Sequence, residues 1–219
     1  MGSDFVTVEE AIEAIARGEV VIVMDDEDRE NEGDFICAAE KITPEIVNFM
    51  LRHGRGQVCM SLLPETCDRL ALHPMVGKNT APLETAFTVP VDHKTCRTGI
   101  TAFEKASTIH ALIDPKSLPE DFVRPGHLFP LKAKEGGVLR RAGHTEAALD
   151  LSRLAGLMPA GVLCEILNDT GDRASREELQ KIAEQFNLKM TTIAALIRYR
   201  RRSEKLVRRA AEAHLPTRF

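Results

Sequence analysis

The 219-residue sequence contains no tryptophan and one tyrosine, and aromatic residues make up only 5% of it. Recognition of single strands by base stacking needs several aromatic side chains, so we expect no nucleic-acid partner. No apolar run approaches the ~18 residues of a membrane-spanning helix. The N-terminus has no basic segment followed by an apolar one, which argues against a secretory signal. We therefore expect a soluble protein with no membrane partner.

Cysteine is scarce and shows no pairing pattern. The five cysteines are odd in number, and no C-x-x-C spacing occurs. This argues against both a disulfide framework and a zinc site, so we expect reduced cysteines and a cytoplasmic location. The sequence also lacks a Walker P-loop and a dinucleotide-binding glycine fingerprint. A nucleotide-dependent mechanism is therefore not indicated.

Charge is divided unevenly along the chain. The net charge is −4, which does not favour a general nucleic-acid binder. From residue 173 onward there are 12 Lys and Arg against 5 Asp and Glu, whereas the preceding part has 17 against 28. A basic C-terminal region therefore follows an acidic body. With 43% apolar residues, the chain can bury the core of one large domain or of two small ones.

The most acidic stretch is residues 25–34, which holds seven carboxylates in ten positions. Apolar runs typical of buried strands precede and follow it, so we interpret it as a strand-to-strand connection on a rigid scaffold. If its end is extended, Glu30, Glu32 and Asp34 alternate onto one face. Such crowded carboxylates need a counterion, and a hard divalent cation such as Mg²⁺ prefers oxygen ligands. The plain alternative is a solvated acidic turn.

Hydrophobic periodicity and helix-capping signals predict the remaining elements. Helices are expected over residues 7–18, 43–53, 101–113, 145–156 and 175–186, and in the basic region after 190. Strands are expected over residues 20–24, 35–39, 56–63, 86–91, 162–167 and 188–190, with a further short strand after a turn at 125–127. Residues 77–99 are otherwise polar and weakly periodic, which is typical of a lid or binding loop.

The segment Arg141-Ala142-Gly143-His144-Thr145 precedes a helix that we expect Thr145 to open. Free backbone N–H groups and the helix macrodipole favour an anion at such a position. Arg141 adds a fork-shaped donor suited to phosphate, and His144 is a potential metal ligand. An ordinary capped helix start remains the alternative.

Three further residues are chemically notable. Glu165 lies within an apolar strand, where a carboxylate is costly unless it is paired or protonated. It is therefore a candidate for acid–base work, the alternative being a paired core glutamate. Cys59 lies near the centre of a predicted strand, where inert packing is the more common role. His127 follows Pro125-Gly126 and, taken alone, reads as a turn residue.

Six motifs occur in one order along the chain. They are Asp26-x-x-Arg29-Glu-Asn-Glu-Gly-Asp34, His53-Gly-x-Gly56-x-Val-Cys59, Thr98-Gly-Ile100, Pro125-Gly-His127-x-Phe-Pro130, Arg141-Ala-Gly-His-Thr-Glu146 and Glu165. Together they resemble the 3,4-dihydroxy-2-butanone-4-phosphate synthase family of riboflavin biosynthesis, over about residues 3–202. One departure is Thr101-Ala-Phe-Glu104-Lys105, where the family more often has Ser-Ala-x-Asp-Arg. This departure leaves the fine shape of that loop open.

The resemblance implies a lyase that converts D-ribulose 5-phosphate to formate and 3,4-dihydroxy-2-butanone 4-phosphate, with Mg²⁺ or Mn²⁺ as cofactor. It implies an α+β fold, with a single domain over residues 1–202 built on a mixed β-sheet flanked by helices. Residues 203–219 would then be a basic C-terminal extension or linker. It also implies a homodimer whose active sites take residues from both subunits.

The same resemblance assigns roles to individual residues. Glu30 and His144 would bind the metal, and His127 and Glu165 would be essential for catalysis. The substrate would be bound by Arg29, Glu30, Asp34, Cys59, Arg141, Ala142, Gly143, His144, Thr145 and Glu165, with Glu32 also lining the site.

Other interpretations remain open at this point. The scaffold could support another Mg²⁺-dependent sugar-phosphate lyase or isomerase. The basic residues between Arg198 and Arg209, with Tyr199, could instead bind RNA on a repurposed scaffold. More simply, the basic helix could lead into a second domain. In bifunctional relatives that domain is a GTP cyclohydrolase II, and residues 213–219 resemble such a junction.

Overall fold

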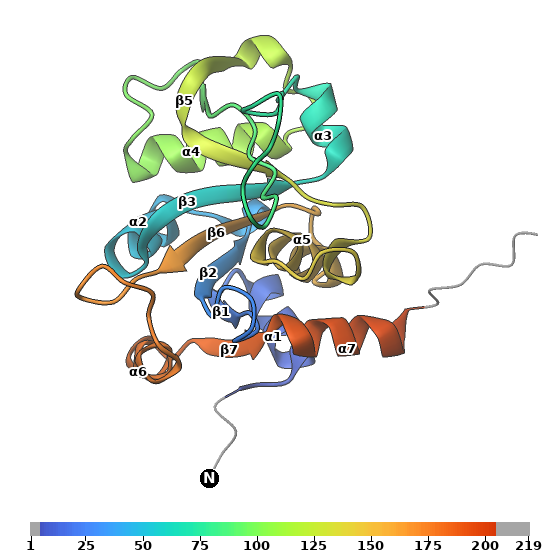
Figure 1. Cartoon of the computed structure of the whole chain (residues 1–219). Helices are drawn as coiled ribbons and strands as arrows, with labels where there is room; N and C mark the ends of the chain where they lie inside the picture. Colours follow the sequence, from blue (N-terminus) through green and yellow to red (C-terminus); the bar gives the residue numbers. More distant parts are fainter. Residues whose placement is uncertain (1–4, 205–219) are drawn as a thin grey trace, which may run out of the picture.

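The computed structural model describes residues 5–204 (Figure 1). This part of the chain forms a single domain with one mixed sheet and helices on both of its faces, which confirms the expected α+β fold. The strands are β1 (Val21–Met24), β2 (Gly33–Ala38), β3 (Arg55–Leu62), β4 (Val91–His93), β5 (Phe122–Lys132), β6 (Gly161–Ile166) and β7 (Lys189–Thr192). The α-helices are α1 (Val8–Arg17), α2 (Pro44–His53), α3 (Pro64–Arg69), α4 (Ala102–Ile113), α5 (His144–Leu154), α6 (Arg176–Phe186) and α7 (Ile193–Ser203).

The strands lie in the order β4-β5-β3-β6-β2-β1-β7 across the sheet. The pairs β3–β5 and β1–β7 are parallel, and the other neighbouring pairs are antiparallel. β1 and β2 are joined by the acidic stretch, with Met24 opposite Gly33 where the connection begins and ends. β6 lies on the other side of β2 and places Glu165 opposite Asp34. The sheet thus brings Glu165 next to the acidic stretch.

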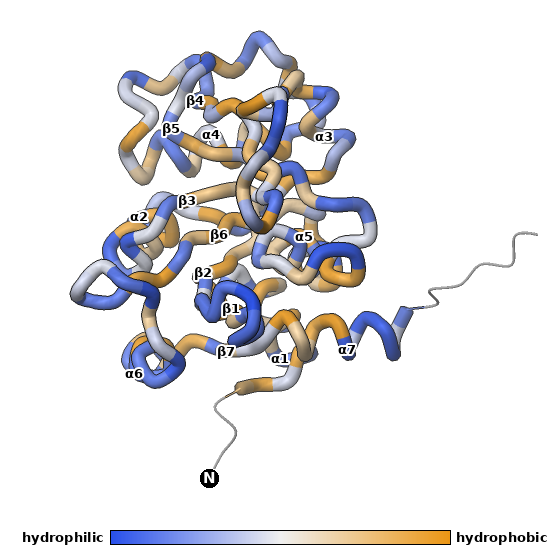
Figure 2. Tube along the Cα trace, viewed as in Figure 1, coloured by the Kyte–Doolittle hydropathy of each residue, from blue (hydrophilic) through white to orange (hydrophobic). Residues whose placement is uncertain are grey.

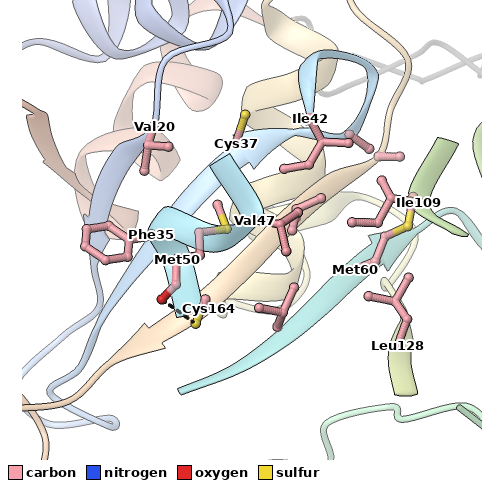
Figure 3. Close-up of a cluster of buried hydrophobic side chains, with 14 of the residues drawn as sticks. Val20, Phe35, Cys37, Ile42, Val47, Met50, Met60, Ile109, Leu128 and Cys164 are labelled. Atoms are coloured by element: carbon pink, nitrogen blue, oxygen red, sulfur yellow. Dashed lines mark hydrogen bonds between the residues drawn. The ribbon is translucent and has the colours of Figure 1, made fainter. Parts of the chain in front are cut away.

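Successive residues of the central strands alternate between two apolar cores. In β2, Phe35 and Cys37 belong to one core, whereas Ile36 and Ala38 belong to the other. Helices α2, α4 and α6 cover the first core, part of which is shown in Figure 3. Helices α1, α5 and α7 cover the second. The strands are therefore largely apolar, while the β1–β2 connection is strongly hydrophilic (Figure 2).

Helix starts follow the capping signals in the sequence. Thr7 and Ser175 each form a capping box with the glutamate three residues later. Thr43 accepts a hydrogen bond at the start of α2, whose first residue is a proline, and Thr101 does the same for α4. These side chains accept backbone N–H groups that have no partner within the helix. The four predicted helix starts are confirmed.

The strand predicted at residues 86–91 is wrong in its extent. β4 begins only at Val91, and the preceding residues form isolated bridges such as Phe87 with Leu131. Pro90 separates these bridges from β4. Because proline has no N–H to donate, it interrupts a continuous ladder at that point.

The turn predicted at residues 125–127 lies inside β5. Val91 pairs with Leu128, but the next residue, Asp92, pairs with Val123, so residues 124–127 have no counterpart in β4. Such a register shift is a bulge, which bends the strand and redirects its side chains. The Pro-Gly sequence therefore marks a bulge within the strand and not its beginning.

In the described part of the chain, no helix is both long enough and apolar enough to cross a bilayer. The five cysteines are free thiols. Arg200, in the basic run, is buried and donates hydrogen bonds to Asp150 Oδ2 and Gly136 O, both at 2.7 Å. It therefore belongs to the packing of α7 and not to a basic surface. Residues 205–219, which include most of the expected extension, lie outside the described residues.

Candidate active site

A cavity of about 200 Å³ lies between the β1–β2 connection, the start of α5 and the centre of the sheet. Its volume is below the ~300–1,000 Å³ of sites for drug-sized ligands, so it suits a small molecule. It is lined by Arg29, Glu30, Glu32, Asp34, Cys59, Thr85, Phe87, Leu131, Arg141, His144, Thr145, Leu163 and Glu165. The structure thus brings together most of the residues that the sequence singled out.

The acidic connection is not extended over its whole length, but Glu30, Glu32 and Asp34 all line the cavity. Residues 27–30 form turns, and Asn31 adopts a left-handed conformation with φ of 52°. The loop folds back on Asp25, which accepts hydrogen bonds from the backbone N–H groups of Glu30 and Glu32 at 3.1 and 2.9 Å. Glu30 is therefore placed by a turn and Asp34 by strand β2, and both line the cavity together with Glu32.

Asp25, Glu30 and His144 form a cluster with the composition of a cation site. One potential ligand atom from each lies within 4.8 Å of the others. The Arg29 guanidinium contacts both Asp25 and Glu30, and so supplies positive charge between the two carboxylates. Carboxylate oxygens and a neutral imidazole nitrogen are suitable ligands for Mg²⁺ or Mn²⁺.

His144 is held in the protonation state that a metal ligand needs. Its Nε2 lies 3.0 Å from Val23 O and donates to it, which leaves the lone pair on Nδ1. Burial lowers the pKa of the ring to about 4, so the imidazole is neutral at neutral pH. Nδ1 lies 3.9 Å from Asp34 Oδ1, a buried oxygen with no hydrogen-bond partner among residues 5–204. The residues present therefore fit a divalent cation.

Asp34 is the most strongly perturbed carboxyl group of the cavity. It is 2% exposed. Burial raises its pKa well above the usual value, and the nearby carboxylates, beginning with Glu165, raise it further. The pKa of Glu32 is also raised, again chiefly by burial. Carboxyl groups with perturbed pKa values are candidates for proton transfer to or from a bound substrate.

A second part of the cavity, next to the cation cluster, has the features of an anion site. α5 begins at His144, one residue before the expected Thr145, and its N-cap residue Gly143 supplies no side-chain cap. The first backbone N–H groups of α5 are therefore available to a ligand. Arg141 is fixed beside them by Glu146, with Nη1 to Oε2 at 2.8 Å. A side chain at Gly143 would collide with that guanidinium, because an added Cβ would lie 2.3 Å from Nη1.

Glu165 is accessible and paired at once. It is half-buried, and its Oε2 accepts the backbone N–H of Gln57 at 3.0 Å. The Glu165 carboxylate is therefore paired, as the alternative interpretation expected. It also lines the cavity. Cys59 lies beside it, and burial raises the pKa of the Cys59 thiol well above its usual value. Cys59 is consequently a neutral wall residue and not a thiolate nucleophile.

His127 is the one predicted catalytic residue that does not line this cavity. It lies in the bulged part of β5, its side chain is 50% exposed, and Nδ1 lies 2.7 Å from Asp92 Oδ2. Ala142 and Gly143 are likewise absent from the cavity wall; Gly143 is the N-cap residue of α5, and Ala142 precedes it.

Sequence reasoning missed several residues of the site. Asp25 belongs to the acidic stretch, but the sequence around it did not predict that Asp25 would be buried and would accept the hydrogen bonds of the loop. Arg141 binds the loop above the cavity, donating to Leu83 O and to Thr85 Oγ1 at 3.0 Å from Nη2. No spacing in the sequence connects Thr85 with Arg141, because the contact depends on how the irregular loop folds over the sheet.

A model of the 3,4-dihydroxy-2-butanone 4-phosphate synthase family matches residues 9–199. The chain belongs to this family. The expectation of an enzyme family of riboflavin biosynthesis is thereby confirmed. The chain is 58% identical to riboflavin biosynthesis protein RibBA of Aquifex aeolicus over 217 residues, covering 97% of this chain and 53% of the relative. It is 56% identical to RibBA of Bacillus subtilis over 215 residues, covering 98% and 54%. The chain thus spans about half the length of these curated relatives.

Solved structures of the same family share the fold. RibBX, a two-domain 3,4-dihydroxy-2-butanone 4-phosphate synthase from A. baumannii, superposes with a TM-score of 0.91 and 47% identity, covering 97% of this chain and 63% of that one. A 3,4-dihydroxy-2-butanone 4-phosphate synthase in complex with two magnesium ions superposes with a TM-score of 0.85 and 40% identity, covering 91% and 98%. That relative therefore binds magnesium ions.

Proposed function

We propose that this chain converts D-ribulose 5-phosphate to 3,4-dihydroxy-2-butanone 4-phosphate and formate. The observation that carries the proposal is the cavity, which joins a cation cluster, perturbed carboxyl groups and an anion site within one small volume. The reaction balances without an external oxidant, because the five-carbon substrate is divided into a four-carbon ketone and formate. The cavity favours a small, negatively charged ligand with several oxygen atoms.

Two adjoining parts of the cavity fix the orientation of the substrate. The backbone at the start of α5 and Arg141 would hold the phosphate, and Glu30 and His144 would hold Mg²⁺ or Mn²⁺ beside it. A divalent cation there would act as a Lewis acid that stabilises the negative oxygen atoms of enediolate-like species. The family relative in complex with two magnesium ions supports the use of a divalent metal by this chain. Mg²⁺ and Mn²⁺ both suit carboxylate-rich ligands.

The remaining residues handle protons. The reaction removes protons next to carbonyl groups, loses water, migrates a carbon, and takes up a water again as formate is expelled. Glu165 is exposed enough to reach substrate and is anchored by the N–H of Gln57, so its carboxylate is positioned as a base. Burial raises the pKa of Asp34, and Asp34 lies opposite Glu165 in the β2–β6 register, so it is a second candidate for proton transfer. Two neighbouring carboxyl groups of the cavity wall are therefore within reach of one another for proton exchange with the substrate.

His127 supports a homodimer with shared active sites. It lies outside the cavity of its own chain, and the elements around it expose apolar side chains: Phe103 is 71% exposed, Ile100 57% and Val123 50%. Exposed apolar side chains of this size are typical of a surface covered by another protein. A second copy on this face would bury them and bring His127 to the neighbouring cavity. The predictions of a cytoplasmic location and of a further C-terminal domain stay as predictions.

The direct test is formate release from D-ribulose 5-phosphate by the purified chain, with Mg²⁺ and then with excess EDTA. We expect formate with the metal and none with the chelator, with recovery on adding excess Mg²⁺. Formate production that is insensitive to EDTA would contradict the role of Glu30 and His144. No formate from folded protein with either Mg²⁺ or Mn²⁺ would contradict the proposed reaction.

A further inference from the structure

Asp92 is a buried carboxylate outside the cavity. It lies on β4 and is only 5% exposed. Both of its oxygens face His127: Oδ1 accepts the backbone N–H at 2.9 Å, and Oδ2 lies 2.7 Å from ring Nδ1. The imidazole itself is half exposed. Both carboxylate oxygens of the buried Asp92 thus contact His127, whose side chain is half exposed.

The backbone around His127 is fixed from other directions as well. Lys105, a buried residue of α4, donates from Nζ to His127 O. The N–H of Gly126 donates to Pro90 O at 2.8 Å. An added Cβ at Gly126 would lie 2.1 Å from the carbonyl carbon of Val91, so only glycine allows this close approach. The peptide units on both sides of His127 are therefore held, and the ring is oriented by Asp92.

A second segment encloses the carboxylate of Asp92. Gly99 adopts φ of 72°, and an added Cβ there would lie 1.9 Å from Asp92 Oδ2. Glu104 holds this segment in place by accepting the N–H and hydroxyl of Thr98 at 3.2 and 2.7 Å. The Thr98-Gly99-Ile100 motif of the sequence is thus explained as the cover over Asp92, which keeps water from competing for its oxygens.

We propose that Asp92 is a positioning residue that acts through His127. By accepting the Nδ1–H it fixes one tautomer of the neutral ring, in which Nε2 carries the exposed lone pair and can take up a proton. This inference rests on the proposed function, in which His127 takes part in proton transfer. The buried aspartate of serine proteases orients its histidine by the same physical principle.

The contact with the backbone makes Asp92→Asn a directed test. The N–H of His127 is always a donor, so the single amide oxygen of asparagine must accept it. The amide NH₂ then faces Nδ1 and turns that atom into an acceptor. The ring proton is thereby moved to Nε2, the atom that carries the exposed lone pair in the wild-type protein. A nearly isosteric change is therefore expected to invert the tautomer without opening a cavity.

The tautomer can be measured directly on the intact protein. Long-range ¹H–¹⁵N spectra of histidine-labelled protein, recorded at a pH where the ring is neutral, distinguish protonated from unprotonated ring nitrogens. We expect His127 of the wild-type protein to be protonated at Nδ1 and that of Asp92→Asn at Nε2, with His127→Gln identifying the signals. An unchanged tautomer in a folded Asp92→Asn variant would overturn the proposal. This readout needs no turnover, so it does not depend on the reaction being correctly assigned.

Kinetics supply the second test. We expect Asp92→Asn to lower kcat by ~10²-fold or more with little change in KM, and to have no further effect when His127→Gln is already present. Asp150→Asn is the matched control, because Asp150 is also a buried carboxylate that accepts a backbone N–H, from Val138, and faces a cation, Arg200. That control should lose thermal stability but keep kcat. Additive losses in the double variant would overturn the positioning role.

Discussion

Glu165 combines accessibility with a fixed carboxylate, and both properties depend on its neighbours. Gly56 allows the approach: an added Cβ there would lie 2.9 Å from Glu165 Oε2 and 2.4 Å from the carbonyl oxygen of Glu165. The next residue, Gln57, donates its backbone N–H to Oε2. A glycine in the adjacent strand thus makes room for a carboxylate that lines the cavity.

Glu165→Gln should lower kcat by ~10²–10⁴-fold, because an amide cannot accept the substrate proton. KM should change little, since the amide oxygen can still accept the N–H of Gln57 and no phosphate contact is lost. Formate assays over a range of substrate concentrations separate the two parameters. Glu184→Gln, an exposed residue of α6, is the control. An unchanged kcat would remove Glu165 from the catalytic set.

At the scale of elements, α7 is anchored by ion pairs as well as by its apolar face. Glu204, at its end, accepts hydrogen bonds from Arg200 Nη2 at 2.7 Å and Arg153 Nη2 at 2.9 Å. Hydrogen bonding by Arg200, and then by Arg153, lowers the pKa of Glu204 to about 2. The carboxylate is partly exposed, so we expect its contribution to stability to stay within ~1 kcal/mol.

This anchor should make stability depend on pH in a defined direction. A carboxyl group with a lowered pKa in the folded state stabilises fully above its unfolded pKa, near 4.5, and loses its effect as the pH falls toward 2. Glu204→Gln should therefore lower Tm by ~2–4 °C at neutral pH and by progressively less below pH 4.5. Thermal unfolding followed by circular dichroism checks this. A difference in Tm that is constant with pH would contradict it.

The elements also show what the sequence could predict. Caps at Thr7, Thr43 and Ser175 are local signals, and the helices that they predict are confirmed. The bulge at residues 124–127 depends on where β4 pairs, and the contact of Thr85 with Arg141 depends on the course of a long loop. Both are set by tertiary geometry. The family motifs identified the residues of the cavity, but they did not show that His127 lies outside it or that Asp92 supports it.

For the whole molecule, a shared site predicts complementation. His127→Ala and Glu165→Gln should each be inactive as homodimers. If His127 serves the neighbouring cavity, mixing the two variants under exchange conditions creates a heterodimer in which one site has both wild-type residues. Formate production should then recover to a fraction of the wild-type rate. Two variants with substitutions at the same position provide the control. No recovery in a mixture proven to contain heterodimers would place both residues in one subunit's site.

The order of the strands also decides when this site can exist during synthesis. β1 and β2, which carry the acidic connection, pair with β7 and β6, and these strands appear in the chain only at residues 189–192 and 161–166. At ~5–20 residues per second, the ribosome completes β6 on the order of 10 s after β2. Until then, the seven carboxylates of the connection have neither the neighbouring strand nor the start of α5 to hold them. The proposed site therefore cannot form until nearly the whole domain has left the ribosome.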